Sequence, residues 1–343
     1  FMTFLVLLSD FIYSNFFYEK DYKDIIQTNH KIYHHGMNKN LEVKGNWDGR
    51  TFDICTDSFG SKKDCNNKEK IKDFDIAFIG DSFTEGVGQN YEDSFVGIIE
   101  KRINLKITNL GVSTYSPVIY FHKVKYLLNE GLTFKHLILF MDLTDIPDEL
   151  IWKNCGNYVC ENLKLGSNPM LINLKKNLKH NFRFLYGTYY KIKSNYVDKP
   201  DNFNTKNVGP LDYDYPRSSW PYNSNHSIYQ NKNDQKAIEL AKTHTLMLYE
   251  LLQKNNITLS IAVYPHPSNV LYGSIDSKQV QIWREFCINK CFEFIDFYKL
   301  FFEMKKNMSS DQIVKKYYYR NDNHFNKLGN KVVGENFPIK KFK

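Results

Sequence analysis

The sequence predicts an α/β fold in which a mainly parallel sheet is covered by helices on both faces. Two observations predict it. Short apolar runs alternate along the chain with segments whose apolar residues recur at helical spacing, which is typical of strand–helix–strand units with right-handed crossovers. One such run, residues 76–79, ends in Gly80-Asp81-Ser82. This places a serine at the carboxyl end of a strand, where open α/β sheets bind their ligands.

The elements follow in chain order. Strands are expected where apolar residues run together without strict alternation, because such strands are buried on both faces; these are residues 75–80, 106–110, 135–141, 258–264 and 292–296. Helices are expected where apolar residues share one face; these are residues 93–103, 117–129, about 233–254, 277–289 and a last helix after Asn326.

The segments outside this pattern suggest the domain organisation. Residues 1–20 begin with a short apolar run, which we interpret as the end of a membrane anchor or signal segment; an amphipathic first helix packed on the domain is the alternative. Residues 21–71 are polar, and we expect an N-terminal extension. Residues 72–343 form the α/β domain, with an insertion at about 146–232 rich in Asn, Tyr, Lys and Pro. The aromatic residues of this insertion could form a platform for sugar rings or a small packed lid.

Composition limits the partners and the compartment. The net charge of +8 comes from scattered lysines, without an arginine cluster, zinc-ligand spacing or a Walker-type loop, so we expect no nucleic-acid partner, no metal and no other cofactor. The six cysteines fall in three pairs close in sequence, Cys55/Cys65, Cys155/Cys160 and Cys287/Cys291. Three local disulfides would fit an oxidising compartment and therefore export; six unpaired buried thiols are the alternative.

A second motif, near the C-terminus, suggests chemistry for Ser82. Asp322-Asn323-His324 places an acid and a histidine two positions apart before the last helix. A nucleophilic serine needs a base to take its proton, and the base needs a third group to fix its tautomer. His324 and Asp322 could fill these roles. The structural alternatives are a serine that only caps a helix and a polar surface loop.

At these residues the chain resembles a known family. The run from Gly80 to Gly86 resembles the first block of the SGNH (GDSL-type) hydrolase superfamily, Asn109-Leu110-Gly111-Val112-Ser113 is similar to its second block, and residues 322–326 resemble its last block. The resemblance implies a three-layer, flavodoxin-like sandwich. It also implies Ser82 as nucleophile, His324 as base, Asp322 as the orienting acid, and the backbone N–H groups of Ser82 and Gly111 in the oxyanion hole.

The sequence departs from the family pattern in two places. The third block usually reads Gly-x-Asn-Asp, whereas this chain has Asp142-Leu143-Thr144-Asp145, so Thr144 becomes the third candidate oxyanion donor on a shorter arm. The last block is usually Asp-x-x-His, whereas here it is Asp-x-His, which we interpret as a variant spacing.

One further histidine belongs to the predicted site. His266 follows the strand at 258–264 between two prolines, so it lies at the same sheet edge as Ser82. We expect it to contact substrate; a competing base or a plain loop histidine are the alternatives. Together these features predict an exported serine esterase, possibly membrane-anchored through its N-terminus, that acts on an acylated small molecule or glycan. The alternatives are an O-acyltransferase with the same triad and a non-catalytic glycan-binding protein.

Overall fold

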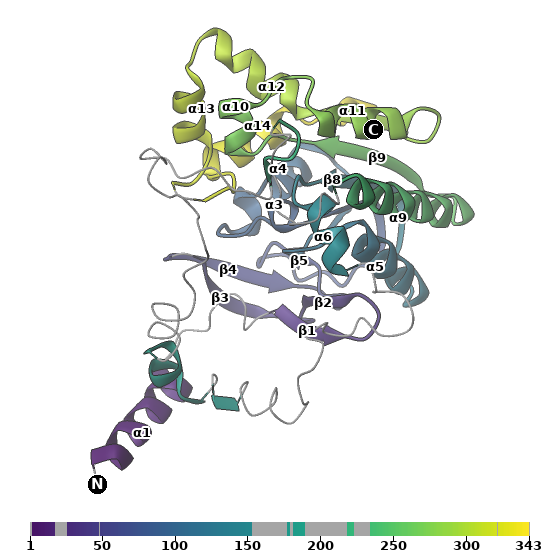
Figure 1. Cartoon of the computed structure of the whole chain (residues 1–343). Helices are drawn as coiled ribbons and strands as arrows, with labels where there is room; N and C mark the ends of the chain where they lie inside the picture. The colour runs from purple at the N-terminus through teal and green to yellow at the C-terminus, as the bar shows by residue number, and fades with distance from the viewer. Residues whose placement is uncertain are drawn as a thin grey trace. The chain divides into compact units, whose positions relative to one another are not determined.

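The computed structural model describes residues 2–17, 26–47, 49–152, 177–178, 181–188, 218–222, 234–320 and 322–342. These residues belong to two compact units. The first unit comprises Phe1–Lys20 and Asn162–Gly209, and the second comprises Asp21–Glu161 and Pro210–Lys343. The second unit contains the sheet that the sequence predicts (Figure 1).

An eight-stranded sheet runs through the second unit in the order β10-β9-β8-β6-β7-β5-β4-β3. Its first five strands are parallel; they are β10 (Glu293–Asp296), β9 (Thr258–Val263), β8 (Thr133–Met141), β6 (Asp73–Gly80) and β7 (Ile107–Asn109). The remaining strands continue the sheet antiparallel; they are β5 (Lys62–Lys63), β4 (Arg50–Thr56) and β3 (Glu42–Trp47). Within residues 21–71, the strands β3, β4 and β5 therefore lengthen the sheet at one of its edges. The same region also forms a separate hairpin of β1 (Ile26–His30) and β2 (His34–Met37).

Helices cover both faces of the parallel strands because successive strand residues point to opposite sides. Ala77 and Ile79 pack in one apolar cluster with three helices; these are α5 (Pro117–Asn129), α9 (Asp234–Lys254) and α11 (Lys278–Cys287). Ile76 and Phe78 pack in a second cluster on the other face, with α4 (Phe95–Arg102), α12 (Phe297–Glu303), α13 (Ser310–Tyr317) and α14 (Lys327–Asn336). The predicted three-layer α/β sandwich with a mainly parallel sheet is confirmed (Figure 1).

Local sequence explains where the helices begin. Asn326 caps α14 by accepting hydrogen bonds from the backbone N–H groups of Leu328 and Gly329, and Ser94 caps α4 in the same way from Gly97. Such side chains satisfy N–H groups that have no partner inside the helix. Asp145–Trp152 forms a helix, α6, at the start of the predicted insertion. Most of the rest of that insertion lies outside the described residues.

Two of the three predicted cysteine pairs form disulfides. Cys55 at the end of β4 is bonded to Cys65, and Cys287 at the end of α11 is bonded to Cys291. The third pair, Cys155 and Cys160, lies outside the described residues.

The first unit begins with the apolar helix α1 (Met2–Ile12), which continues as a π-helical turn, η1 (Tyr13–Phe17). Asp10 of α1 accepts hydrogen bonds from the backbone N–H groups of Phe184 and Leu185, at 3.0 and 2.9 Å. These contacts connect the N-terminal helix to a helical stretch at residues 183–188. Among the described residues, none of the helices has the length and apolar content needed to cross a bilayer.

Candidate active site

Ser82 stands at the carboxyl end of β6, as the sequence predicts for a strand that ends in Gly-Asp-Ser. Gly80 is the last residue of β6, and a Cβ there would come within 2.1 Å of the Thr84 hydroxyl and 2.7 Å of the Phe140 carbonyl oxygen. Only glycine fits this position. Asp81 then caps the short helix α3 (Ser82–Glu85), because its Oδ1 accepts the N–H of Phe83 at 3.0 Å. This turn presents the Ser82 side chain at the sheet edge.

The loop between α13 and α14 brings an imidazole to this serine. His324 Nε2 lies 2.7 Å from Ser82 Oγ, and His324 Nδ1 lies 2.6 Å from Asp322 Oδ1. Asp322 Oδ1 also accepts the backbone N–H of His324 at 3.2 Å, so the shorter Asp-x-His spacing makes a tight turn. The structure thus joins Ser82, His324 and Asp322 in one hydrogen-bonded chain, which is the arrangement in which a carboxylate orients a base and the base activates a hydroxyl.

The pKa shifts of Asp322 and His324 favour this hydrogen-bonded arrangement. Burial acts to raise the pKa of Asp322, but hydrogen bonds from His324 and Trp47 and the charge of His324 outweigh burial, so the pKa lies well below its ordinary value. Burial acts to lower the pKa of His324, but the hydrogen bond and charge of Asp322 outweigh it, so this pKa is raised. Asp322 is therefore ionised across the physiological range, and His324 becomes a free base at a higher pH than an ordinary histidine.

The antiparallel strands β3 and β4 supply two donors to the Asp322 carboxylate. Trp47 Nε1 donates to Asp322 Oδ2 at 3.1 Å, and Arg50 Nη2 forms an ion pair with the same oxygen at 2.5 Å. The Arg50 guanidinium lies over the Tyr319 ring at 3.9 Å, and the Trp47 ring stands edge-on to the imidazole of His324 at 5.5 Å. Sequence reasoning missed both residues, because they lie in β3 and β4, far along the chain from the motif they support.

Asp81 also contacts the Ser82 hydroxyl. The Ser82 hydroxyl is within 3.0 Å of Asp81 Oδ2, so Asp81 and His324 flank the same oxygen. Burial and then the charge of Asp142 raise the pKa of Asp81 to about 7. In its neutral form Asp81 can donate to Ser82 Oγ, which leaves the serine proton directed at His324. In its ionised form Asp81 accepts a hydrogen bond from the Ser82 hydroxyl, so the serine proton points at Asp81 instead.

Thr144 and Gly111, the two further oxyanion donors that the family resemblance implies, both make local hydrogen bonds, and Thr144 lines the cavity that contains Ser82. The Thr144 N–H and hydroxyl both donate to Asp142 Oδ1 at 2.7 Å. The Gly111 N–H donates to Asn109 Oδ1 at 3.0 Å, and a Cβ on Gly111 would meet the Glu85 backbone nitrogen at 2.7 Å. Gly111 thus allows close packing under α3, and both candidate donors are already engaged.

Thr114 directly follows the residues of the second block. It lines the same cavity as Ser82 and has a left-handed backbone, with φ of 64°. This conformation is unfavourable for a β-branched residue and persists only where surroundings enforce it. Here the Ser113 N–H and hydroxyl donate to Glu85, and the Thr114 carbonyl accepts the Trp152 indole N–H at 3.0 Å. The sequence carried no signal for this residue.

His266 lies at the predicted sheet edge but does not contact Ser82 in the structure. Its Nε2 is 2.6 Å from Asp142 Oδ2, and Tyr264 donates to the same oxygen at 2.8 Å. The Phe83 ring lies about midway, with ring centroids 5.0 Å from His266 and 4.9 Å from His324. His266 therefore lines the cavity, and its Nε2 is hydrogen-bonded to Asp142.

Three buried carboxylates gather beneath the nucleophile, namely Asp81, Asp142 and Asp145, each with an oxygen within 4.8 Å of the others. They are the described residues that could hold a metal ion. Protein donors already reach all three; Asp145 Oδ2, for example, accepts from Tyr120 and from the Asp142 N–H. Burial, and then the charges of Asp81 and Asp142, raise the pKa of Asp145 well above its ordinary value.

The cavity at Ser82 holds about 160 Å³. Both predicted histidines line it, together with Trp47, Thr114 and Asp148. This volume suits a small polar ester group.

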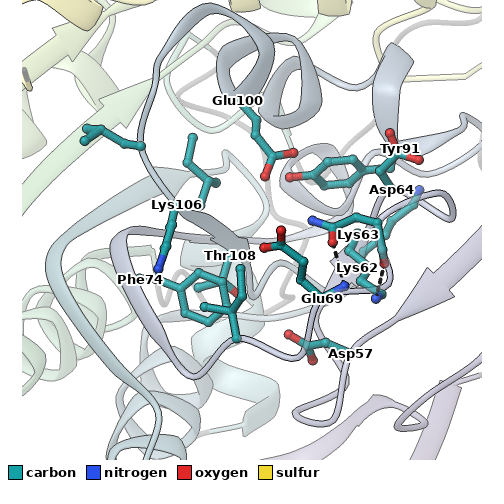
Figure 2. A pocket seen from close by; sticks show the side chains of 14 residues that line it. Asp57, Lys62, Lys63, Asp64, Glu69, Phe74, Tyr91, Glu100, Lys106 and Thr108 are labelled. Atoms are coloured by element: carbon teal, nitrogen blue, oxygen red, sulfur yellow. Dashed lines mark hydrogen bonds between the residues drawn. The ribbon is translucent and has the colours of Figure 1, made fainter.

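A second cavity, of about 190 Å³, is lined by residues of β5, the loop after β5 and β7, and by charged side chains such as Lys62, Glu69 and Glu100 (Figure 2). Among the described residues, it shares no lining residue with the cavity at Ser82. Its Lys62 donates to the carbonyl oxygens of Gly86 and Gln89 at 2.9 and 2.8 Å, and burial lowers the pKa of Lys62 to about 8. Lys62 thereby fixes the turn that follows the nucleophile helix.

Comparisons with known proteins give few matches. No family model matches the chain, and no curated protein matches it. Among solved structures it is similar to a protein assigned as lipolytic and of the G-D-S-L family, from Desulfitobacterium hafniense DCB-2. That match has 14% sequence identity and a TM-score of 0.34, and it covers 77% of this chain and 97% of the other.

Proposed function

We propose that the protein is a serine esterase that removes O-acyl groups, with a carbohydrate as the substrate. One observation carries the proposal, the unbroken hydrogen-bonded chain from Ser82 Oγ through both nitrogens of His324 to Asp322. A serine that only caps a helix would not need a buried imidazole on its hydroxyl and a carboxylate on that imidazole.

The geometry supports a two-step reaction. Ser82 Oγ attacks the ester carbonyl carbon while its proton moves to His324 Nε2. The tetrahedral intermediate collapses when the C–O bond to the alcohol breaks and His324 returns the proton to the leaving oxygen. Water then attacks the acyl-serine, giving its proton to His324, and Ser82 leaves with that proton as the free acid is released. Asp322 stays ionised throughout and stabilises the imidazolium.

We assign the oxyanion site to two backbone N–H groups. Ser82 is the first residue of α3, where N–H groups have no partner inside the helix. Thr114 faces the same cavity from a strained turn that Glu85 and Trp152 hold. Fixed donors of this kind stabilise a developing negative charge without reorganisation.

The carbohydrate and export parts have separate support. The cavity combines Trp47 with polar residues such as Asp148 and Asn323, and an aromatic edge beside hydroxyl-binding groups suits a sugar. The insertion supports this less than expected, since Trp220 is buried and donates to the Leu143 carbonyl. The Cys55–Cys65 and Cys287–Cys291 disulfides support an oxidising compartment.

Mass spectrometry of the intact protein after exposure to an activated acetyl ester tests the proposal. We expect one added acetyl group on the native chain, localised to the peptide containing Ser82, and none on Ser82→Ala. Ser309→Ala, which changes a serine on the surface cap of α13, is the matched control and should still be acetylated. Labelling of Ser82→Ala at the native level would refute the serine mechanism.

A sugar acceptor in the same reaction separates hydrolysis from transfer. If acetylated sugar accumulates at the expense of free acetate, the acyl-serine is intercepted by a hydroxyl and the protein is an O-acyltransferase. If acetate alone forms, it is an esterase. A folded native chain that forms no acyl-serine would support the non-catalytic alternative.

A further inference from the structure

The β1–β2 hairpin reaches the turn that contains Thr114. His35 of β2 is buried, and its Nε2 lies 2.8 Å from the Ser113 carbonyl oxygen and 3.2 Å from the Thr114 hydroxyl. The Tyr115 hydroxyl in turn donates to the His35 carbonyl oxygen at 2.6 Å. The turn between β7 and α5 is therefore hydrogen-bonded to the hairpin on both sides of Thr114.

The surroundings of His35 determine which of its nitrogens carries the proton. A carbonyl oxygen only accepts, so the Nε2 that faces Ser113 is the donor. Burial lowers the pKa of His35 to about 3, so the ring is neutral and its Nδ1 is an acceptor. This Nδ1 lies 2.7 Å from His34 Nδ1, which therefore donates to it. The pair of histidines thus presents one N–H of fixed direction to the Ser113 carbonyl.

The oxygen that His35 contacts and the N–H of Thr114 belong to the same peptide unit. A trans peptide is planar, and its C=O and N–H bonds point in opposite directions. Within the described part of the chain this N–H donates to no protein group, and Thr114 lines the cavity at Ser82. The hydrogen bond from His35 therefore fixes the direction of the N–H, and it also polarises the peptide toward a stronger donor.

Trp152 holds the other side of the turn. Its Nε1 donates to the Thr114 carbonyl at 3.0 Å, and its ring packs on the imidazole of His34 with centroids 4.2 Å apart. His34 and Thr114 each have a left-handed backbone, with φ of 64°, which is uncommon for residues with a side chain and persists where the surroundings enforce it. The two unusual backbone positions therefore belong to one packed unit.

We propose that His35 and Trp152 are positioning residues that fix the Thr114 N–H in the oxyanion site. This inference rests on the serine esterase function proposed above. An oxyanion donor is most effective when its direction is set before the negative charge develops. His35 sets that direction through the carbonyl of the same peptide, and Trp152 does so through the next carbonyl along the chain. The hairpin that precedes the α/β domain thereby takes part in forming the site.

Kinetics on one activated ester test this inference. His35→Phe removes the donor to the Ser113 carbonyl, so the peptide can rotate and kcat should fall by up to about 100-fold. KM should stay within about 2-fold, because the N–H acts in the transition state. His35→Gln, whose amide N–H can replace that donor, should recover most of the rate. Trp152→Phe keeps an aromatic ring beside His34 but loses the bond to Thr114, so its kcat should fall at unchanged KM as well.

An inhibitor and a matched control separate positioning from a loss of structure. A trifluoromethyl ketone forms a tetrahedral adduct with a reactive serine, so its affinity should fall in each variant by the same factor as kcat. His136 is another buried histidine, bonded to Thr258 and Ser260 near the amino ends of β8 and β9. His136→Phe should lower the thermal unfolding midpoint and leave kcat at the native value.

The possible results distinguish this inference from the function on which it rests. Native kcat in a folded His35→Phe would overturn the inference, and so would a loss of kcat that His35→Gln and His136→Phe share. Where His35→Phe does not fold, Trp152→Phe decides by the same kinetics, and native kcat there would overturn the inference. A native chain that forms no acyl-Ser82 would instead defeat the proposed function, and this inference with it.

Discussion

Arg50 Nη2 lies 2.5 Å from Asp322 Oδ2, across 272 residues of chain. The two oxygens of Asp322 are divided between two tasks, because Oδ1 serves His324 and Oδ2 accepts from Arg50 and Trp47. The antiparallel strands β3 and β4 therefore contact Asp322 of the hydrogen-bonded chain directly, through Trp47 and Arg50. Arg50 and Trp47 are positioning residues for the acid.

Arg50→Gln should change the pH profile as well as the rate. Removing the guanidinium leaves the full charge of Asp322 to act on His324, so the raised pKa of His324 rises further and the acid limb of kcat/KM moves to higher pH. The loss of positioning should lower kcat about 10-fold. Arg50→Lys, which keeps the charge, should retain the native limb. Unchanged limbs in Arg50→Gln would show that the ion pair only stabilises the fold.

The two histidines of the cavity should differ sharply in importance. His324→Gln removes the base, and we expect kcat to fall about 1,000-fold or more. His266→Gln keeps a donor toward Asp142 and does not touch Ser82, so its effect should fall mainly on KM, within about 10-fold. Steady-state kinetics on one activated ester decides between them. Comparable kcat losses in both variants would return His266 to the role of a competing base.

Asp81→Asn tests how the nucleophile is kept reactive. With a pKa of about 7, Asp81 is neutral below this pH and donates to Ser82 Oγ; above it, the ionised carboxylate competes with His324 for the serine proton. The native enzyme should therefore lose kcat/KM on the alkaline side. Asn is a permanent donor and still caps α3, so the variant should hold its rate at high pH. Asp145→Asn is the control, because Asp145 belongs to the same buried carboxylate cluster and its Oδ2 accepts from Tyr120 and the Asp142 N–H. If kcat/KM of Asp81→Asn fell at high pH as it does for the native chain, this explanation would be contradicted.

Lys123 gives a prediction for stability. Lys123 belongs to α5, and its buried ammonium group donates to the Leu110 carbonyl at 2.8 Å; burial lowers its pKa to about 7. Between about pH 7 and 10 the unfolded chain holds this proton and the folded chain does not, so native stability rises with pH. Lys123→Met has no such group. The free energy of unfolding of Lys123→Met should exceed that of the native chain by the largest amount at pH 6. This difference should shrink toward pH 10. Urea titrations at both values measure this, and a constant difference would refute it.

The Cys55–Cys65 disulfide closes a loop with a sequence separation of 10. By the loop-entropy model, replacing both cysteines by Ser should cost about 2–3 kcal/mol of stability. Because Cys55 ends the strand that carries Arg50, kcat should fall as well, whereas replacing Cys287 and Cys291 should affect stability alone. Thermal unfolding and kinetics of the two double variants compare these effects. Equal kcat in both would show that the pairing of β4 with β3 holds Arg50 without the disulfide.

The sequence was most informative where one local rule determines structure. Strands such as 135–141 are apolar on both faces and cannot be placed at a surface, and Gly80-Asp81-Ser82 admits one kind of turn. The antiparallel strands β3 to β5 were not assigned to the sheet because their residues are partly polar and exposed. Arg50 and Trp47 could not be found from a motif, since their contact with Asp322 depends on the whole fold. The oxyanion roles of Thr144 and Gly111 stay predictions, and their hydrogen bonds to neighbouring Asp142 and Asn109 are contacts that no motif specifies.

The edge-on contact of Trp47 with His324 makes the indole an optical reporter. A protonated imidazole quenches tryptophan emission far more than a neutral one, and the two rings lie 5.5 Å apart at 88°. A fluorescence titration compared between the native chain and Trp47→Phe would isolate this signal from the remaining tryptophans. The protonation of His324 can thus be followed by light in the resting protein, before any substrate has been identified.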